Sequence, residues 1–202
     1  MQTQSMISPV LFELDMNPLK TKPPKKPKLT LQLKNMQCPD IIPSPSTARH
    51  ISCPSITSNI IKVNNQLYFG GQPTQNDLKT LKKTNISIIV NLAAGKLPNT
   101  FEDHFKYENY MIEDTFDQDF EANLANIILN INNHIKSGKV VYVHCRKGIS
   151  RAPCIIIAYL MVYQNHGYQQ SMNCIRELKP TIDLNIWFIQ VLQKVGREFQ
   201  LE

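Results

Sequence analysis

The chain has 202 residues, a hydrophobic fraction of 42% and a formal net charge of +6 at pH 7. This length suffices for one compact domain with a tail, and it excludes two ordinary domains with separate cores. No apolar run is long enough to span a membrane, and the N-terminus shows no secretory signal. We therefore expect a soluble intracellular protein without a membrane partner.

The first part of the chain differs in composition from the rest. Nine of the thirteen prolines fall within the first 54 residues, and six lysines lie between Lys20 and Lys34. Such a segment buries too little apolar surface to offset the entropy of ordering it. We therefore expect a flexible tail over residues 1–56 and a folded domain over residues 57–202. Nucleic acid is not an expected partner, because the basic residues are not interleaved with aromatic ones.

The five cysteines predict reduced thiols, since an odd number at irregular spacing fits neither a disulfide framework nor a CxxC zinc pair. A cytoplasmic or nuclear location follows from this prediction. Cys154 and Cys174 are interpreted as small, inert apolar residues. The sequence leaves open whether Cys154 lies close enough to Cys145 to form a disulfide.

Hydrophobic periodicity predicts an α/β domain with helices on both faces of the sheet. A capping box of Thr74 and Asp77 is expected to begin the first helix. A tight turn at Asn64 and Asn65 is expected to join the first two strands. The predicted strands cover residues 60–63, 67–69, 86–92, 106–112 and 140–143. The predicted helices cover residues 74–83, 116–135, 153–162, 168–178 and 184–199.

The loop from His144 to Arg151 connects a buried strand to a buried helix and carries the chemistry. Cys145 follows the strand, and Arg151 stands six positions later at the start of the helix. The backbone N–H groups of the loop and the helix N-terminus can bind an anion together, and their field favours the thiolate form of Cys145. Gly148 lets the loop curl around a phosphate, and Arg151 can bind two phosphoryl oxygens. This pattern predicts phosphoryl transfer to a cysteine.

Such a transfer also needs an acid for the departing oxygen and later a base for water. Asp114 is the candidate, because it stands 31 residues before Cys145 in a loop between a predicted strand and the long helix. Asp117 and Asp119 are local alternatives.

The loop resembles the HCxxGxSR signature of the dual-specificity phosphatases. Further similarities are Ala158 to Met161, Asn91-Leu92, Ile112 to Asp114, and Asn185 with Phe188, so the resemblance covers about residues 57–202. It implies a protein-tyrosine-phosphatase-like fold with a central, mostly parallel but mixed sheet of about five strands. Ala152 departs from the family pattern, which commonly has a second serine there.

The resemblance also implies roles for individual residues. Cys145 would be the nucleophile, Asp114 the general acid, and Ser150 would assist the departure of the thiolate during hydrolysis of the intermediate. His144 would orient the loop and tune the thiol. No metal or organic cofactor is implied. The implied phosphate-binding residues are Arg146, Lys147, Gly148, Ile149, Ser150 and Arg151.

The implied reaction is hydrolysis of phosphotyrosine, phosphoserine and phosphothreonine through a cysteinyl-phosphate intermediate. Lipid phosphatases of the superfamily tend to carry extra basic residues in this loop, as in HCKAGKGR. The pair Arg146 and Lys147 instead favours a phosphoprotein substrate. A phosphoinositide or other non-protein phosphatase and a catalytically inactive phosphate-binding module are the alternatives.

The tail contains a second motif, in which Lys25, Lys26 and Lys28 are followed by Leu29 and Leu31. It resembles the docking motif that mitogen-activated protein (MAP) kinases bind. The lysines could meet an acidic patch while the leucines enter a groove. A nuclear-localisation role and chance occurrence are alternatives for so short a motif.

Overall fold

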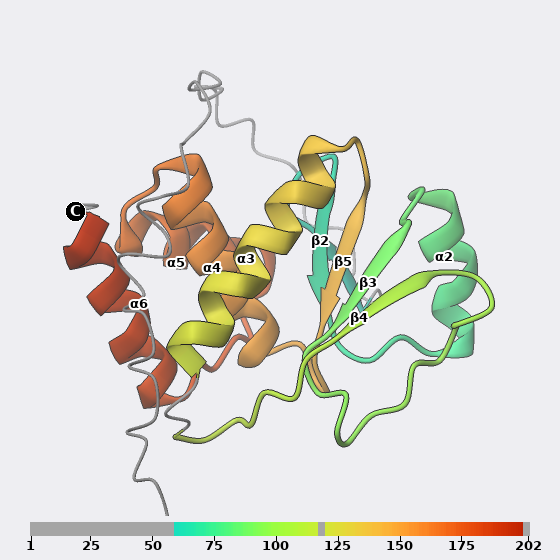
Figure 1. Cartoon of the computed structure of the whole chain (residues 1–202), viewed down its shortest axis with the longest axis horizontal. Helices are drawn as coiled ribbons and strands as arrows, with labels where there is room; N and C mark the ends of the chain where they lie inside the picture. Colours follow the sequence, from blue (N-terminus) through green and yellow to red (C-terminus); the bar gives the residue numbers. More distant parts are fainter. Residues whose placement is uncertain (1–58, 117–119, 200–202) are drawn as a thin grey trace, which may run out of the picture.

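The computed structural model describes residues 59–116 and 120–199, which form one central sheet with helices on both sides (Figure 1). β1 is antiparallel to β2, and every other neighbouring pair of strands is parallel. The predicted mostly parallel, mixed sheet is confirmed, while the predicted tail over residues 1–56 lies outside the described residues. The strands lie in the order β1 (Ile60–Lys62), β2 (Leu67–Gly70), β5 (Val141–His144), β3 (Ile88–Asn91) and β4 (Lys106–Asn109).

The central strand β5 is buried on both faces, as its run of apolar residues predicts. Val141 and Val143 face a large apolar cluster, whereas Tyr142 between them faces a smaller one that contains Leu81. Alternation of side chains along a strand therefore divides the core into two layers.

The two layers are covered by different helices. The helix α2 (Leu78–Lys83), with the 3-10 turn η1 (Gln75–Asp77) before it, contributes Leu81 to the smaller layer. The N–H of Thr74 donates to Oδ2 of Asp77 at 2.8 Å, as the predicted capping box requires. On the opposite face, Figure 1 shows the other helices. They are α3 (Phe120–Lys136), α4 (Arg151–Gln164), α5 (Tyr168–Leu178) and α6 (Ile186–Phe199).

Several helix boundaries differ from the prediction, among them the starts of three helices. Phe116, the predicted start of the long helix, is not helical, and the described helix α3 starts at Phe120 after residues that the structure does not describe. The helix α4 begins at Arg151, two residues before Pro153, because a proline in the first turn of a helix needs no N–H partner. The helix α6 begins at Ile186, because Oδ1 of Asn185 accepts the N–H of Phe188 at 2.9 Å and caps the helix.

The segment after β4 continues beside β3 towards the carboxyl end of the sheet. The N–H of Tyr110 donates to the carbonyl of Asn91 at 2.8 Å, and the N–H of Ile112 donates to the carbonyl of Leu92 at 3.0 Å. The same end of the sheet receives the end of β5 and the loop that follows it. Ligand sites of open α/β sheets commonly lie at this end.

The helix α4 leaves that loop and runs through the larger layer. From Arg151 to Val162 every residue of α4 is buried, which confirms the prediction of a helix surrounded by protein. Among the described residues, no helix is both long and apolar enough to cross a membrane.

Candidate active site

The loop between β5 and α4 depends on Gly148, whose φ of +68° lies in the left-handed region. A Cβ at this position would also lie 2.2 Å from the carbonyl carbon of Gly70 and 2.5 Å from the amide nitrogen of Gly71. Both the backbone conformation and the contact with β2 therefore exclude a side chain at this position.

Backbone hydrogen bonds connect the loop to the end of β2 and the residues after it. The N–H of Cys145 donates to the carbonyl of Gly70 at 3.4 Å, and the N–H of Gln72 donates to the carbonyl of Arg146 at 3.1 Å. The amide group of Asn59 in turn binds the N–H of Gly71 and the carbonyl of Gln72, each at 3.1 Å. The sequence gives no signal for this role of Asn59.

Cys145 lies at the floor of the loop and is 2% exposed. Its Sγ accepts a hydrogen bond from the N–H of Gly148 at 3.3 Å. A backbone donor of the loop therefore faces the sulfur atom.

Arg151 is the first residue of α4 and is 8% exposed. Its Nη1 donates to the carbonyl of Ile112 at 3.1 Å, and its Nε lies 3.7 Å from Oδ2 of Asp114. Arg151, the candidate for phosphate binding, therefore contacts the segment that carries Asp114, the candidate for the acid.

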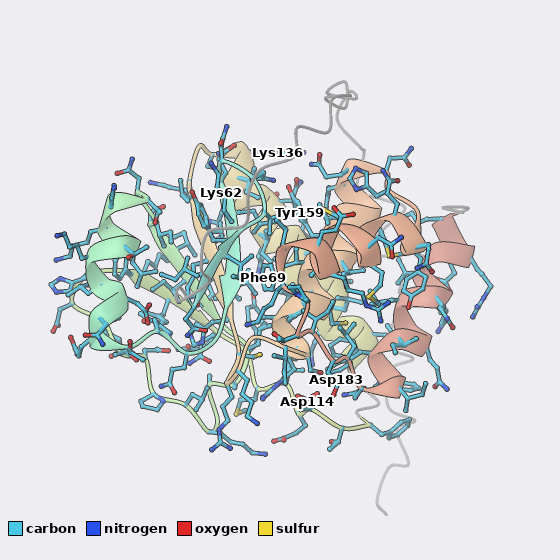
Figure 2. The ribbon with its side chains drawn as sticks, turned by 180° about the vertical axis from the view of Figure 1, so that it is seen from behind. Lys62, Phe69, Asp114, Lys136, Tyr159 and Asp183 are labelled. Atoms are coloured by element: carbon cyan, nitrogen blue, oxygen red, sulfur yellow. The ribbon has the colours of Figure 1, made fainter. Side chains whose placement is uncertain are left out.

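Asp114 lies against both the loop and α6. Its Oδ1 accepts a hydrogen bond from Oγ of Ser150 at 2.6 Å and one from Nδ2 of Asn185 at 3.0 Å. Asp117 and Asp119, the alternatives for the acid, lie outside the described residues. Figure 2 shows Asp114 and Asp183 at one end of the molecule, with Lys62 and Lys136 at the other.

His144 is buried, and loss of solvent lowers its pKa to about 4, so the ring is neutral near pH 7. Its Nδ1 lies 3.3 Å from the carbonyl oxygen of Cys145, which can only accept, so Nδ1 carries the hydrogen. The ring also stacks on Tyr142 at a centroid distance of 5.9 Å, and the hydroxyl of Tyr142 donates to the carbonyl of Gly71 at 2.6 Å. A neutral ring in these contacts can orient the loop but supplies no positive charge.

The remaining loop residues differ in exposure. Arg146 and Lys147 are exposed, whereas Ile149 is half-buried. The carbonyl of Lys147 accepts Nζ of Lys179 at 3.2 Å, and the carbonyl of Ile149 accepts the N–H of Asp183 at 2.8 Å. The segment between α5 and α6 therefore holds the outer side of the loop, which the sequence does not predict.

A pocket of about 490 Å³ opens beside the loop. Basic and acidic groups both line it, and Nζ of Lys96 binds Oε2 of Glu113 at 2.5 Å. The pocket is lined by Gln72, Ala93, Lys96, Leu97, Glu113, Asp114, Thr115, Arg146 and Arg151.

The two other described cysteines lie in helices. Cys154 is fully buried in α4, and loss of solvent raises the pKa of its thiol well above the usual value. Cys174 is half-buried in α5, and desolvation raises its pKa as well. Neutral thiols fit the predicted role of small apolar residues. In the described part of the chain, no group of three or more His, Cys, Asp or Glu could hold a metal ion.

Comparisons with known proteins identify the family. The family model described as "Dual specificity phosphatase, catalytic domain" matches residues 67–198. The structure is similar to the crystal structure of human DUSP28, with a TM-score of 0.62, 18% identity, and coverage of 73% of this chain and 99% of that one. At this identity the likeness shows the fold alone, which is that of the protein tyrosine phosphatase class. The chain belongs to the dual specificity phosphatase family.

Two curated relatives show how far the similarity extends. The chain is 31% identical to dual specificity protein phosphatase 19 of Mus musculus over 138 residues, which cover 65% of this chain and 60% of that protein. It is 34% identical over 143 residues to MAP kinase phosphatase with leucine-rich repeats protein 3 of Dictyostelium discoideum. That match covers 69% of this chain and 16% of that protein. The chain thus spans less than two thirds of the length of each of these relatives.

Proposed function

We propose that this protein is a dual-specificity protein phosphatase that hydrolyses phosphotyrosine, phosphoserine and phosphothreonine through a cysteinyl-phosphate intermediate. Family membership and the residues around the loop support this proposal. Phosphoproteins are the proposed substrates. The reaction needs no cofactor, because a thiolate, an arginine and one carboxyl group supply the chemistry.

In the first step, Sγ of Cys145 attacks phosphorus, so that a sulfur–phosphorus bond forms while the bond to the substrate oxygen breaks. Asp114 gives its proton to the departing oxygen, which leaves as a neutral hydroxyl group. The guanidinium of Arg151 and the N–H groups of the loop bind the phosphoryl oxygens through the transition state.

In the second step, water attacks phosphorus, the sulfur–phosphorus bond breaks, and Asp114 takes up a proton of the water. Ser150 is proposed to stabilise the departing thiolate. A hydroxyl has a single hydrogen, so Ser150 cannot donate to Asp114 and to sulfur at once. Its hydrogen bond to Oδ1 of Asp114 must therefore break before this step.

The observation that carries the proposal is the contact between Asp114 and the loop. A structural carboxylate has no need to lie 2.6 Å from Ser150 and 3.7 Å from the guanidinium of Arg151. An acid that serves a phosphoryl group bound by Arg151 must lie next to it.

We further propose that the substrate is a MAP kinase, bound by the tail through Lys25, Lys26, Lys28, Leu29 and Leu31. The name of the Dictyostelium relative supports this proposal. The docking residues lie outside the described residues. Kinase binding should fall when Leu29 and Leu31 are replaced by alanine, and unchanged binding would refute docking. A cytoplasmic or nuclear location is part of the same proposal.

The experiment that tests the function measures phosphate release from a doubly phosphorylated kinase activation-loop peptide, without added metal. Release from both phosphotyrosine and phosphothreonine is expected for the wild type, and none for Cys145→Ser. Release from phosphotyrosine alone would refute dual specificity. Release from a phosphoinositide but not from the peptide would favour the lipid alternative, and no release from either would favour a phosphate-binding module.

A further inference from the structure

The exposed large hydrophobic residues of the described part gather around Asp114. They are Met111, Phe116 and Ile186, which are 76%, 63% and 69% exposed. The first two flank Asp114 in the chain, and Ile186 follows Asn185, whose side chain donates to Asp114 at 3.0 Å. Exposed apolar surface gathered at one place marks an interaction site more often than scattered exposed residues do.

Phe116 and Ile186 are joined by Trp187, which contacts Phe116 and follows Ile186 in the chain. The ring of Phe116 packs against that of Trp187 with a centroid distance of 4.6 Å and an interplanar angle of 56°. Phe188, next in the chain, is fully buried and packs on Phe120 at a centroid distance of 4.4 Å. The first turn of α6 is thus anchored in the core by Phe188, while Ile186 is exposed and Trp187 is half-buried. We call the surface of Phe116, Ile186 and Trp187 the aromatic ledge.

The surface around Met111, which precedes Asp114 in the chain, is more polar. Met111 packs over Gly95, where an added Cβ would lie 3.1 Å from its Sδ. Next to it, the exposed ion pair between Lys96 and Glu113 lines the pocket. An apolar side chain placed there would have to cover charged groups, so the aromatic ledge is the better apolar surface.

We propose that the aromatic ledge binds an apolar side chain of the phosphoprotein substrate, two or three residues away from the phosphorylated residue. This inference rests on the proposed function and adds a sequence preference to it. The ledge and the phosphate loop share one neighbour, since Asp114 binds Ser150 of the loop and Asn185 at the start of α6. An extended peptide advances about 3.3 to 3.6 Å per residue, so a substrate held in the loop reaches the ledge within a few residues.

An apolar side chain that covers Phe116 and Ile186 removes exposed apolar surface from water, which favours binding. Aromatic and branched aliphatic side chains are the expected occupants, since they offer a large apolar contact with the two rings. A substrate with only polar residues near its phosphate would leave the ledge in water and would lose this contact.

The test uses the full chain and pairs of phosphotyrosine peptides that carry Leu or Ser at each of the three positions before and after the phosphorylated residue. For the wild type, kcat/KM should be about tenfold higher with Leu at one of the positions two or three residues from the phosphorylated residue. The preference should largely disappear in Phe116→Gln and in Ile186→Gln. Met111→Gln is the matched control, and it should keep the preference. A small aryl phosphate, which is too short to reach the ledge, gives the reference rate for each variant.

The proposal would be overturned if no position favoured Leu, if both ledge variants kept the preference, or if Met111→Gln lost it equally. Equilibrium binding of the same peptides to Cys145→Ser gives a readout that needs no turnover. If the wild type hydrolysed no phosphopeptide but Cys145→Ser bound the Leu peptide more tightly than the Ser peptide, the proposed function would fail and the ledge would stand. If hydrolysis occurred without any Leu preference, the ledge alone would fail.

Discussion

Oγ of Ser150 donates a 2.6 Å hydrogen bond to Oδ1 of Asp114, across 36 residues of chain. Ser150 ends the loop that follows β5, and Asp114 follows the segment that runs beside β3. The bond therefore joins two carboxyl-end loops of a parallel sheet. It also places the carboxyl group of Asp114 beside the loop that binds phosphate in the proposed reaction.

If Asp114 is the acid, its amide analogue should fail where a proton is most needed. We expect Asp114→Asn to lower turnover of a phosphopeptide, which has a poor leaving group, by about a hundredfold. An activated aryl phosphate, whose leaving group departs without a proton, should be hydrolysed almost normally. Steady-state kinetics on the two substrates measure the difference. Equal losses would indicate a binding role, and unchanged turnover on both would transfer the role to Asp117 or Asp119.

Asn185 has two roles that substitution can separate. Its Oδ1 caps α6 at Phe188, and its Nδ2 donates to Asp114. Asn185→Ala should lose about 1 kcal/mol of stability through the lost cap, whereas Asn185→Asp keeps a capping acceptor. Both variants lose the donor to Asp114, so both should lower phosphopeptide turnover, by roughly tenfold. The two variants should therefore differ in the free energy of unfolding measured with urea, but they should lose similar amounts of turnover. Normal turnover in Asn185→Asp would show that the contact with Asp114 has no role in the reaction.

Two glycines with similar backbone angles make a matched pair. Gly138 has a φ of +74° and open space where a Cβ would lie, whereas Gly148 has a φ of +68° and the backbone of β2 within 2.2 Å. Gly138→Ala should cost about 1 kcal/mol, from the backbone conformation alone. Gly148→Ala should cost roughly 3 kcal/mol, because the clash with Gly70 is added, and it should abolish phosphate release. Equal unfolding free energies for the two variants would contradict this account.

His144 should make stability fall in mild acid. Burial lowers its pKa from 6.5 to about 4, so the unfolded chain binds a proton more readily than the folded chain does. The stabilising effect is fully present above pH 6.5 and is lost progressively as the pH falls towards 4, by up to roughly 3 kcal/mol. Urea midpoints between pH 8 and pH 4.5 should therefore fall more steeply for the wild type than for His144→Gln. Comparing slopes removes the contribution of His166, whose pKa burial also lowers. Parallel slopes would show that His144 is not the group responsible.

Local patterns were enough to predict most of the elements. The helix α5 has the predicted bounds of Tyr168 and Leu178, and the hairpin of β1 and β2 lies where Asn64 and Asn65 predict a turn. Periodicity and turn residues act within a few neighbours, so they can be read without the fold. Boundaries were less accurate, as at the start of α6, where the cap is a local contact between Asn185 and the N–H of Phe188 that the hydrophobic period alone does not show.

The sequence by itself determined the strand, loop and helix around Cys145, because buried strand, glycine and helix start follow one another directly in the chain. Only the tertiary structure decided that β5 lies between β2 and β3, that Gly148 packs on Gly70, and that Asn185 meets Asp114. These contacts join residues far apart in the chain, and their formation depends on which strands pair and how α6 packs on α4. No local pattern encodes such a choice, because it is made by the packing of the whole core.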